Sequence, residues 1–195
     1  MPTGLAAGKI WPSNAIGGVS AMLWAIVIPI VVIVAVPAVI YLIGSRLPVK
    51  HTATVRGQIK AQPAEVWAII TDFPGQTRWR KGLKKVERSA DKSGHEVWLE
   101  DGKREGKLLL ETMQAEPPKL LVRRIANEKL PFGGGWAIEL AQAGFGTLVI
   151  VTENGEVYNP IFRFFSRFVM DQSATIRNYL ANLEAYVDKL NAEKK

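Results

Sequence analysis

The order of apolar and polar residues divides the chain into one continuous apolar run and a longer region of mixed character. From Ala21 to Gly44 the sequence reads AMLWAIVIPIVVIVAVPAVIYLIG, without a charged side chain. A helix rises about 1.5 Å per residue, so about 20 apolar residues cross a hydrocarbon core of about 30 Å. Trp24 and Tyr41 lie near the two ends of the run, where amphipathic rings favour the lipid headgroups. The pattern predicts a membrane-spanning helix over residues 21–44, after an N-terminal leader over residues 1–20.

Two other interpretations of the apolar run fit it less well. A cleaved signal peptide has an apolar stretch of about 7–15 residues between a basic start and an A-x-A-like cleavage site. This run is longer, only Lys9 precedes it, and Ile43-Gly44-Ser45-Arg46 is a poor cleavage site. A buried core helix would have to hide more uncharged residues than a domain made from the rest of the chain can cover. Because membrane helices tolerate proline, Pro29 and Pro37 predict either kinks without a role or kinks that fit a partner helix.

The charges beside the apolar run predict its orientation. Only Lys9 and the terminal amine precede it, whereas four basic residues follow it before the first acid, Glu65. These four are Arg46, Lys50, Arg56 and Lys60. An excess of Lys and Arg marks the cytoplasmic side of a span. We therefore expect a single-pass protein of the cell membrane whose C-terminal part is cytoplasmic.

The rest of the chain is expected to form one domain after a tether over residues 45–51. Alternating apolar and polar residues predict a half-buried strand over residues 52–60. Pro63 opens a helix, PAEVWAIITDF, that Pro74-Gly75 interrupts before one further turn. Six more strands are expected at residues 83–88, 95–100, 105–113, 120–126, 136–143 and 147–158. The loops between them are short, which favours an antiparallel sheet.

The last element has one apolar stripe. From Asn159 to Asn191 apolar residues recur every three or four positions, which predicts one long helix with Asn159 as its N-cap. Together the elements predict an α+β domain over residues 52–192, in which a seven-stranded curled antiparallel sheet surrounds a long C-terminal helix. Such an arrangement leaves a space between sheet and helix, where hydrophobic ligands bind.

Several segments are similar to those of a known superfamily. They are the first strand, PAEVWAIITDFPGQTRW from Pro63, LKKVER from Leu83, and NYLANLEAYV in the last helix. The chain resembles the helix-grip proteins, which include START-related lipid-transfer domains, polyketide cyclase/dehydrase-like proteins and coenzyme Q-binding proteins. The resemblance covers residues 52–190 and excludes the apolar run. It implies the helix-grip fold and, because the superfamily shares no catalytic set, a hydrophobic ligand rather than one particular reaction.

No catalytic or metal-binding pattern is recognisable in the sequence. The chain has no cysteine and two histidines, His51 and His95, neither of them in a zinc-binding motif. The glycines at 133–135 lack the Lys-Ser/Thr of a phosphate-binding loop, so they predict a flexible loop, with Pro131-Phe132 as a movable apolar flap. We expect no catalytic residue, no metal and no cofactor.

Aromatic residues are the main candidates for ligand binding. Four tryptophans lie in elements that surround the expected space, and two phenylalanines lie on the covering helix; they form either the core or the wall of a cavity for an isoprenoid, an acyl chain or a ring system. An inward-facing Glu, or Arg124, would hold a polar group of the ligand. The candidate residues are Trp67, Trp79, Trp98, Leu108, Leu110, Arg124, Trp136, Ile138, Phe162, Phe165 and Val169. A shift of one residue in register would invert every strand face, so the inward faces stay open.

Composition adds a membrane surface to the expected partners. The 48% of hydrophobic residues excludes a disordered chain, and the net charge of +7 fits a polyanionic partner. For a tethered domain the nearest polyanion is the membrane, where each Lys or Arg contributes about 1 kcal/mol. The segment IFRFFSRF mixes Phe with Arg, as suits a cavity mouth near a membrane. We expect the bilayer and a hydrophobic small molecule as partners, and no nucleic acid.

Three functions remain in order of preference. The first is a membrane-anchored, non-enzymatic domain that binds a lipid or isoprenoid quinone, in binding or transfer at the membrane. The second is an accessory single-span subunit of a larger membrane protein complex. The third is a cyclase- or hydrolase-like enzyme, which needs a convergent polar set that the spacing of the residues does not reveal.

Overall fold

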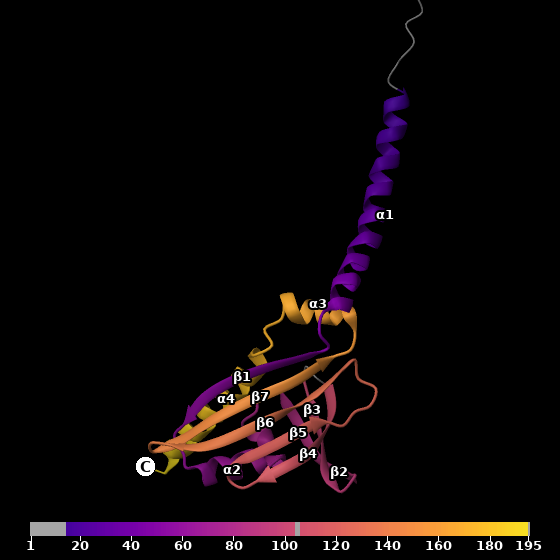
Figure 1. Cartoon of the computed structure of the whole chain (residues 1–195). Helices are drawn as coiled ribbons and strands as arrows, with labels where there is room; N and C mark the ends of the chain where they lie inside the picture. The colour runs from indigo at the N-terminus through magenta and orange to yellow at the C-terminus, as the bar shows by residue number, and fades with distance from the viewer. Residues whose placement is uncertain (1–14, 104–105, 195) are drawn as a thin grey trace, which may run out of the picture.

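Helix α1 (Ala15–Arg46) stands away from the rest of the chain (Figure 1). The computed structural model describes residues 15–103 and 106–194, so residues 1–14 of the predicted leader lie outside the described residues, as do Arg104 and Glu105. Within α1, residues Leu23–Arg46 are long and apolar enough to cross a membrane, and their side chains are largely exposed. The apolar run is therefore a helix of its own, and it ends at Arg46 rather than Gly44.

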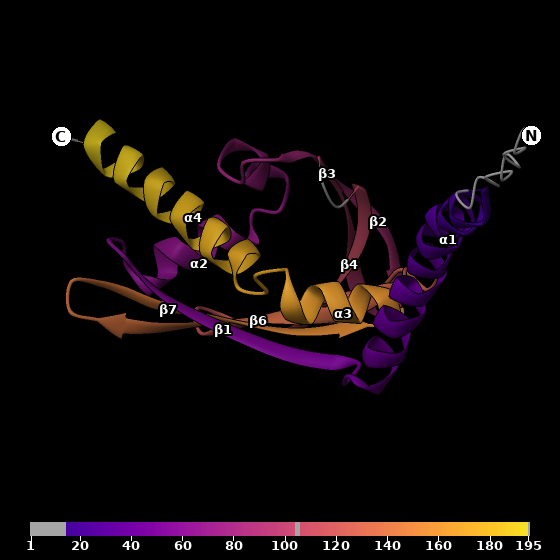
Figure 2. The same cartoon turned by 90° about the horizontal axis from the view of Figure 1, so that it is seen from above.

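One seven-stranded sheet forms the body of the domain, in the order β1-β7-β6-β5-β4-β3-β2. The strands are β1 (Lys50–Ile59), β2 (Leu83–Lys92), β3 (His95–Gly102), β4 (Gly106–Glu116), β5 (Leu120–Ile125), β6 (Phe132–Ala143) and β7 (Gly146–Val157). All neighbours are antiparallel, as the short loops predict. Figure 2 shows β2, β3 and β4 turned up from β1, β6 and β7, so the curled sheet has a concave face.

Three helical segments lie against this sheet: α2 (Pro63–Thr71), the 3-10 helix η1 (Pro74–Arg78) and α4 (Ala174–Glu193). Helix α2 begins where expected, because Pro63 occupies its first turn and the Glu65 carboxylate accepts a hydrogen bond from the Gln62 backbone N–H at 3.0 Å. Figure 2 shows α4 and α2 crossing the concave side of β1, β6 and β7. The predicted order of a strand, an interrupted helix, six strands and a C-terminal helix is confirmed, and with it the helix-grip fold.

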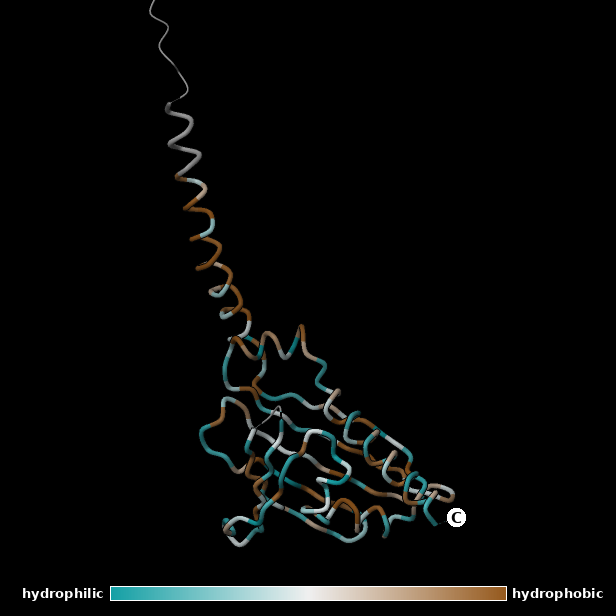
Figure 3. The backbone as a smooth tube through the Cα atoms, turned by 180° about the vertical axis from the view of Figure 1, so that it is seen from behind, coloured by the Kyte–Doolittle hydropathy of each residue, from teal (hydrophilic) through white to brown (hydrophobic). Residues whose placement is uncertain are grey.

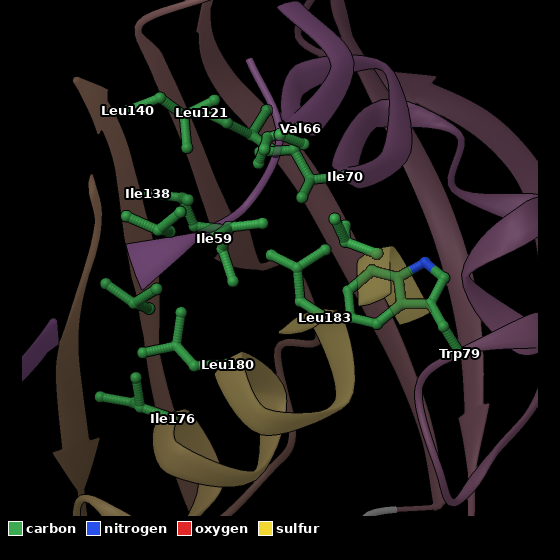
Figure 4. Close-up of a cluster of buried hydrophobic side chains, with 14 of the residues drawn as sticks. Ile59, Val66, Ile70, Trp79, Leu121, Ile138, Leu140, Ile176, Leu180 and Leu183 are labelled. Carbon is green, nitrogen blue, oxygen red and sulfur yellow. The ribbon is translucent and has the colours of Figure 1, made fainter. Parts of the chain in front are cut away.

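The hydrophobic core lies between these helices and the concave face (Figure 4). Helix α4 contributes one side chain per turn, because residues three or four apart share a helix face. These residues are Ile176, Leu180, Leu183 and Val187. They meet Ile59 of β1 and Val149 of β7, while Val66 and Ile70 of α2 close the other side. Each fully buried aliphatic side chain contributes about 1.5–3 kcal/mol, so this cluster supplies much of the stability of the domain.

The expectation of one continuous C-terminal helix is wrong. Helix α3 (Pro160–Phe168) ends before a short turn, and α4 begins at Ala174. The turn is stabilised by Asp171, whose carboxylate accepts the Ser173 N–H at 2.9 Å and pairs with Arg177. The same apolar spacing continues on both sides of the turn, and this continuity conceals the break in the sequence.

The expectation of a flexible glycine loop is also wrong. Strand β6 begins at Phe132, and its residues 133–135 pair with Glu156, Gly155 and Asn154 of β7. Glycine is required here because the strands approach closely: a Cβ on Gly134, which has φ of +111°, would overlap the Asn154 carbonyl. Phe132 is therefore a strand residue, partly buried against a second core cluster, and the movable flap predicted for Pro131-Phe132 is absent from the described residues.

Candidate functional site

The candidate ligand-binding residues fall into two groups around the concave face. Trp67, Trp79 and Ile138 belong to the main core beneath α2 and α4, and the Trp79 ring meets Tyr179 of α4 edge-on at 5.1 Å between centroids. The second group lies along β3, β4 and β6 and comprises Trp98, Leu108, Leu110 and Trp136. Trp98 is opposite Leu110, and Leu110 is opposite Ile125 of β5, so these three share the concave face.

Arg124 lies outside both groups. It is exposed, and it pairs in register with Glu111 of β4 and Gly135 of β6, on the face opposite to Arg123. Successive strand residues point to opposite sides, so Arg123, which is not among the candidates, takes the inward position. The expectation that Arg124 faces the interior is wrong by one residue.

Arg123 belongs to a buried ion network that the sequence did not identify. One Glu100 oxygen accepts from the Arg123 guanidinium at 2.6 Å, and the other accepts from Arg80 at 2.7 Å. The same Arg80 nitrogen donates to the Gln76 side-chain oxygen at 2.6 Å, and Gln76 in turn donates to the Ile70 carbonyl at 2.6 Å. Glu100 is 4% exposed and Arg123 6%, so the pair lies inside the domain.

Burial and charge act against each other in this network. Burial acts to raise the pKa of Glu100, but the guanidinium groups of Arg80 and Arg123 outweigh it and hold the pKa below its usual value. Burial lowers the pKa of Arg123, and the Glu100 carboxylate opposes that shift. Burial also raises the pKa of Tyr179 to about 12, so its hydroxyl is neutral. With two guanidinium groups and one carboxylate, the network carries a net positive charge.

Part of the Arg123 guanidinium has no hydrogen-bond partner in the part of the chain that the structure describes. Its Nε and Nη2 find no hydrogen-bond acceptor among the described residues, and neither does the buried hydroxyl of Thr112, the residue directly opposite on β4. The guanidinium stacks over the Phe73 ring at 4.1 Å from its centroid. An unsatisfied buried donor costs about 1–3 kcal/mol, and more when it is charged. The arrangement is therefore suited to an oxygen that accepts from Arg123.

A second polar group lies on the concave face, nearer the end of the sheet next to α1. Trp136 Nε1 donates to Glu153 at 2.9 Å, and His51 Nε2 is 3.8 Å from the other Glu153 oxygen. The row Thr112, Arg123, Trp136 and Glu153 runs through directly opposite residues of β4, β5, β6 and β7. Three polar side chains and one tryptophan thus lie in one line across the sheet.

Phe162, Phe165 and Val169 are placed differently from the expectation. They lie on α3 and at its end, not on the helix that covers the sheet, and all three are exposed. Helix α3 contacts α1 and the end of β7 (Figure 1). The structure therefore separates these residues from the other candidates.

The surface of the domain has two hollows that are lined by residues other than the candidates. One of about 750 Å³ lies beside the start of α2 and is lined by Pro118, Leu120 and Val122, among others, and one of about 540 Å³ lies under residues 126–130. Neither is lined by a candidate ligand-binding residue. The described residues contain no group of three His, Asp or Glu side chains that could hold a metal ion, and the expectation of no metal and no cofactor stays a prediction.

Comparison with known proteins shows the family. Residues 50–188 match the family model described as polyketide cyclase / dehydrase and lipid transport. The chain belongs to this family. No curated protein sequence matches it.

Solved structures share the fold at low sequence identity. A START superfamily protein from Mycobacterium smegmatis has 16% identity and a TM-score of 0.56, over 72% of this chain and 99% of that one. The Zhui aromatase/cyclase from Streptomyces sp. R1128 has 10% identity and a TM-score of 0.57, over 72% and 94%. The di-domain aromatase/cyclase BexL of the BE-7585A biosynthetic pathway has 10% identity and a TM-score of 0.60. That match covers 74% of this chain but 52% of BexL, so the chain spans about half the length of that relative.

The family and the interior together support binding of a hydrophobic molecule as the general class of function. The family description includes lipid transport, and the structural relatives are START-like. The interior adds a buried guanidinium, that of Arg123, which stacks on the Phe73 ring and has two nitrogens without an acceptor among the described residues.

Proposed function

We propose that the chain is a membrane-anchored protein that binds a lipid or an isoprenoid quinone inside its helix-grip domain, for binding or transfer at the membrane. The apolar part of the ligand lies against Trp98, Leu108, Leu110 and Trp136, and a carboxylate, phosphate or carbonyl oxygen accepts hydrogen bonds from Arg123. The observation that carries the proposal is the Arg123 guanidinium, which is buried and has two nitrogens without a partner among the described residues.

The electrostatics favour an oxygen ligand over an apolar one. Glu100 is already satisfied on both oxygens, by Arg80 and Arg123, so it does not accept a further donor without losing one of them. The remaining positive charge is offset when a ligand oxygen approaches Nε and Nη2 of Arg123, because charge-assisted hydrogen bonds are the strong ones. This polar contact selects one end of an otherwise hydrophobic molecule.

The anchor and its orientation belong to the same proposal. Helix α1 crosses the membrane, and Arg46 in its last turn with Lys50 at the start of β1 supports a cytoplasmic domain. Only residues 47–49 separate α1 from β1, so the domain stays beside the bilayer. A hydrophobic ligand then has a short path between the membrane and the interior.

Mass spectrometry of lipid extracts from the purified full chain tests the ligand. We expect a bound hydrophobic molecule, and we expect Arg123→Met to reduce it about tenfold or more, because a charged hydrogen bond contributes about 1.5–3 kcal/mol and 1.4 kcal/mol is tenfold. In this variant Glu100 keeps Arg80 as a partner. Arg124→Met, the exposed neighbour, is the matched control and should leave the content unchanged. A wild-type chain without any bound molecule contradicts the function, whereas equal content in Arg123→Met contradicts only the role of Arg123.

Cysteine labelling tests the orientation. The chain has no cysteine, and Phe145 in the turn between β6 and β7 is 99% exposed. A Phe145→Cys variant should react with a membrane-impermeant maleimide only after the cells are opened. Labelling in intact cells would place the domain outside and contradict the predicted topology.

A further inference from the structure

Helix α3 exposes an apolar face that the domain leaves uncovered. Ile161, Phe165 and Phe168 recur at four and three positions, which places them on one side of the helix, while Arg163 and Arg167 share the opposite side. Phe165 is 40% exposed and Phe168 60%, and Val169 and Met170 extend the patch beyond the helix end. No side chain of α3, all of which are described, is buried. A contiguous patch of this kind marks a binding surface for a protein or a membrane.

The structure holds α3 firmly against the end of α1. Gly44 lies so close to Pro160 that a Cβ there would overlap the Pro160 carbonyl. Arg163 donates to the Leu47 carbonyl at 2.8 Å, which ties the polar side of α3 to the segment between α1 and β1. The Asn159 side chain accepts the N–H groups of Ile161 and Phe162 at 2.9 and 3.2 Å, so the start of the helix is capped. The position of α3 is thus fixed relative to the last turn of α1.

The direction of α3 fits a membrane surface. In Figure 1 α3 runs crosswise to α1, at the end where α1 meets the domain. Figure 3 shows the same arrangement from behind, with α3 on the side of the domain from which the hydrophobic α1 rises. When α1 spans a bilayer, its last turn lies at the headgroups, and a helix placed crosswise there runs along the interface.

We propose that α3 lies flat in the membrane interface, with Phe165 and Phe168 in the boundary between headgroups and acyl chains and Arg163 and Arg167 on the polar side. This proposal rests on the part of the proposed function in which α1 spans the membrane, but not on any ligand. Interfacial helices bury an apolar face about 5–10 Å into this boundary. The occupant is the lipid of the same leaflet that surrounds the end of α1, because α3, which carries the patch, is held in contact with that end of α1.

Attachment to the membrane through both α1 and α3 would restrict the domain more than attachment through α1 alone. A single helix leaves the domain free to rotate about its axis, whereas α3 in the interface fixes one side of the domain towards the lipid. The end of the sheet held beside α3 carries Glu153, the last residue of the polar row described above, and His51, which lies 3.8 Å from its carboxylate. This end of the concave face is therefore kept next to the bilayer.

Single cysteines in the full chain test the placement of α3. The Phe165→Cys and Phe168→Cys variants are labelled with a polarity-sensitive fluorophore and placed in vesicles of phosphatidylcholine and phosphatidylglycerol. Lipid-attached quenchers should quench both labels several-fold more than labels on two controls, Arg167→Cys on the opposite face of α3 and Phe145→Cys at the far turn. Iodide in the water should show the reverse order. These positions are exposed, so the variants keep the core.

Each other outcome overturns the proposal. Labels that iodide quenches equally at all four positions would mean that α3 lies in water. Labels on Phe165→Cys and Phe168→Cys that neither quencher reaches would mean that a second copy or another protein covers the patch. Lipid extraction of each purified variant before it is placed in vesicles reports ligand content separately, and α1 insertion is read from resistance of the vesicle-bound protein to alkaline extraction. Failure of the proposed function is therefore distinguishable from failure of this one.

Discussion

Helices α3 and α4 follow each other in the chain and have similar apolar spacing, but they face different surroundings. Four residues of α4 are buried against the sheet and α2, whereas α3 has no buried residue and exposes its phenylalanines beside α1. The difference shows that an apolar stripe identifies a helix face that is buried, but does not show whether protein or lipid buries it. The apolar face of α4 is buried by the rest of the domain, and we propose that the apolar face of α3 is buried by lipid.

The largest loss of stability is expected from a change in the buried network of Glu100, Arg123 and Arg80, which lies in the interior that α4 covers. Glu100→Gln leaves the buried Arg123 and the partly buried Arg80 without a counter-charge, and breaking a buried pair in this way costs about 3–5 kcal/mol. Urea unfolding of the full chain in detergent measures the loss. The control is Glu139→Gln on the exposed face of β6, for which we expect less than about 0.5 kcal/mol. Equal stabilities would show that the network is not buried as described.

Truncation of one apolar residue in each helix tests the comparison directly. Leu183 is 0% exposed, and Leu183→Ala should cost about 2–5 kcal/mol, because it removes buried methyl groups and leaves a cavity. Phe165→Ala on α3 should cost less than about 1 kcal/mol in the same unfolding experiment, because Phe165 contributes little to the domain core. A large loss for Phe165→Ala would mean that α3 stabilises the domain as α4 does.

Acid should weaken the interior and leave α3 unaffected. The pKa of Glu100 is lowered in the folded protein, so its carboxylate stabilises the fold above the ordinary carboxyl pKa of about 4.3. This contribution is lost as the pH falls from that value through the lowered pKa. Unfolding measured between neutral pH and acid should therefore show a shallower pH dependence for Glu100→Gln than for the wild type. The fluorescence of a label on Phe168→Cys should stay constant until unfolding begins; parallel pH slopes for the two proteins would contradict this role of Glu100.

The smallest effect on stability is expected at the contact between α1 and α3. Gly44→Leu forces Pro160, and with it the start of α3, away from the last turn of α1 without touching the core, so the free energy of unfolding should change by less than about 1 kcal/mol. The label on Phe165→Cys should nevertheless move closer to water and become more accessible to iodide. Ser45→Leu, at the next position of α1, is the control that keeps this close approach. An unchanged label would show that α3 holds its position without α1.

Local patterns predicted most elements of the fold. The expected strand at 83–88 is β2, and the expected helix from Pro63 is α2, because alternation and first-turn proline act within a few residues. The resemblance to helix-grip proteins supplied the arrangement of these elements. The sequence does not reveal the break at Asp171, because the apolar spacing runs through it, although Ser173 is a residue type that commonly precedes a helix start.

The candidate site was predicted less well than the fold, because the register of strand pairing decides which side chains face the interior. Arg123 and Arg124 are adjacent, and only the pairing of β5 with β4 and β6 decides which of them faces inward. Glu100 looked like an ordinary strand acid, because Arg80 and Arg123 are far from it in the chain. A run of basic and acidic residues on neighbouring strands does not reveal which of them meet.

By itself, the sequence determined that the chain has an apolar run long enough for a membrane, a set of short strands with tight turns, and amphipathic helices. These features follow from the composition of short segments and from the periods of helix and strand. Only the tertiary structure decided that Glu100 joins two arginines and that two Arg123 donors inside the domain have no acceptor in the described part of the chain. It also decided that α3 leaves the sheet to lie at the end of α1. Which side chains meet inside the domain depends on contacts between residues far apart in the chain. A shift of one residue in strand register would turn an inward side chain outward.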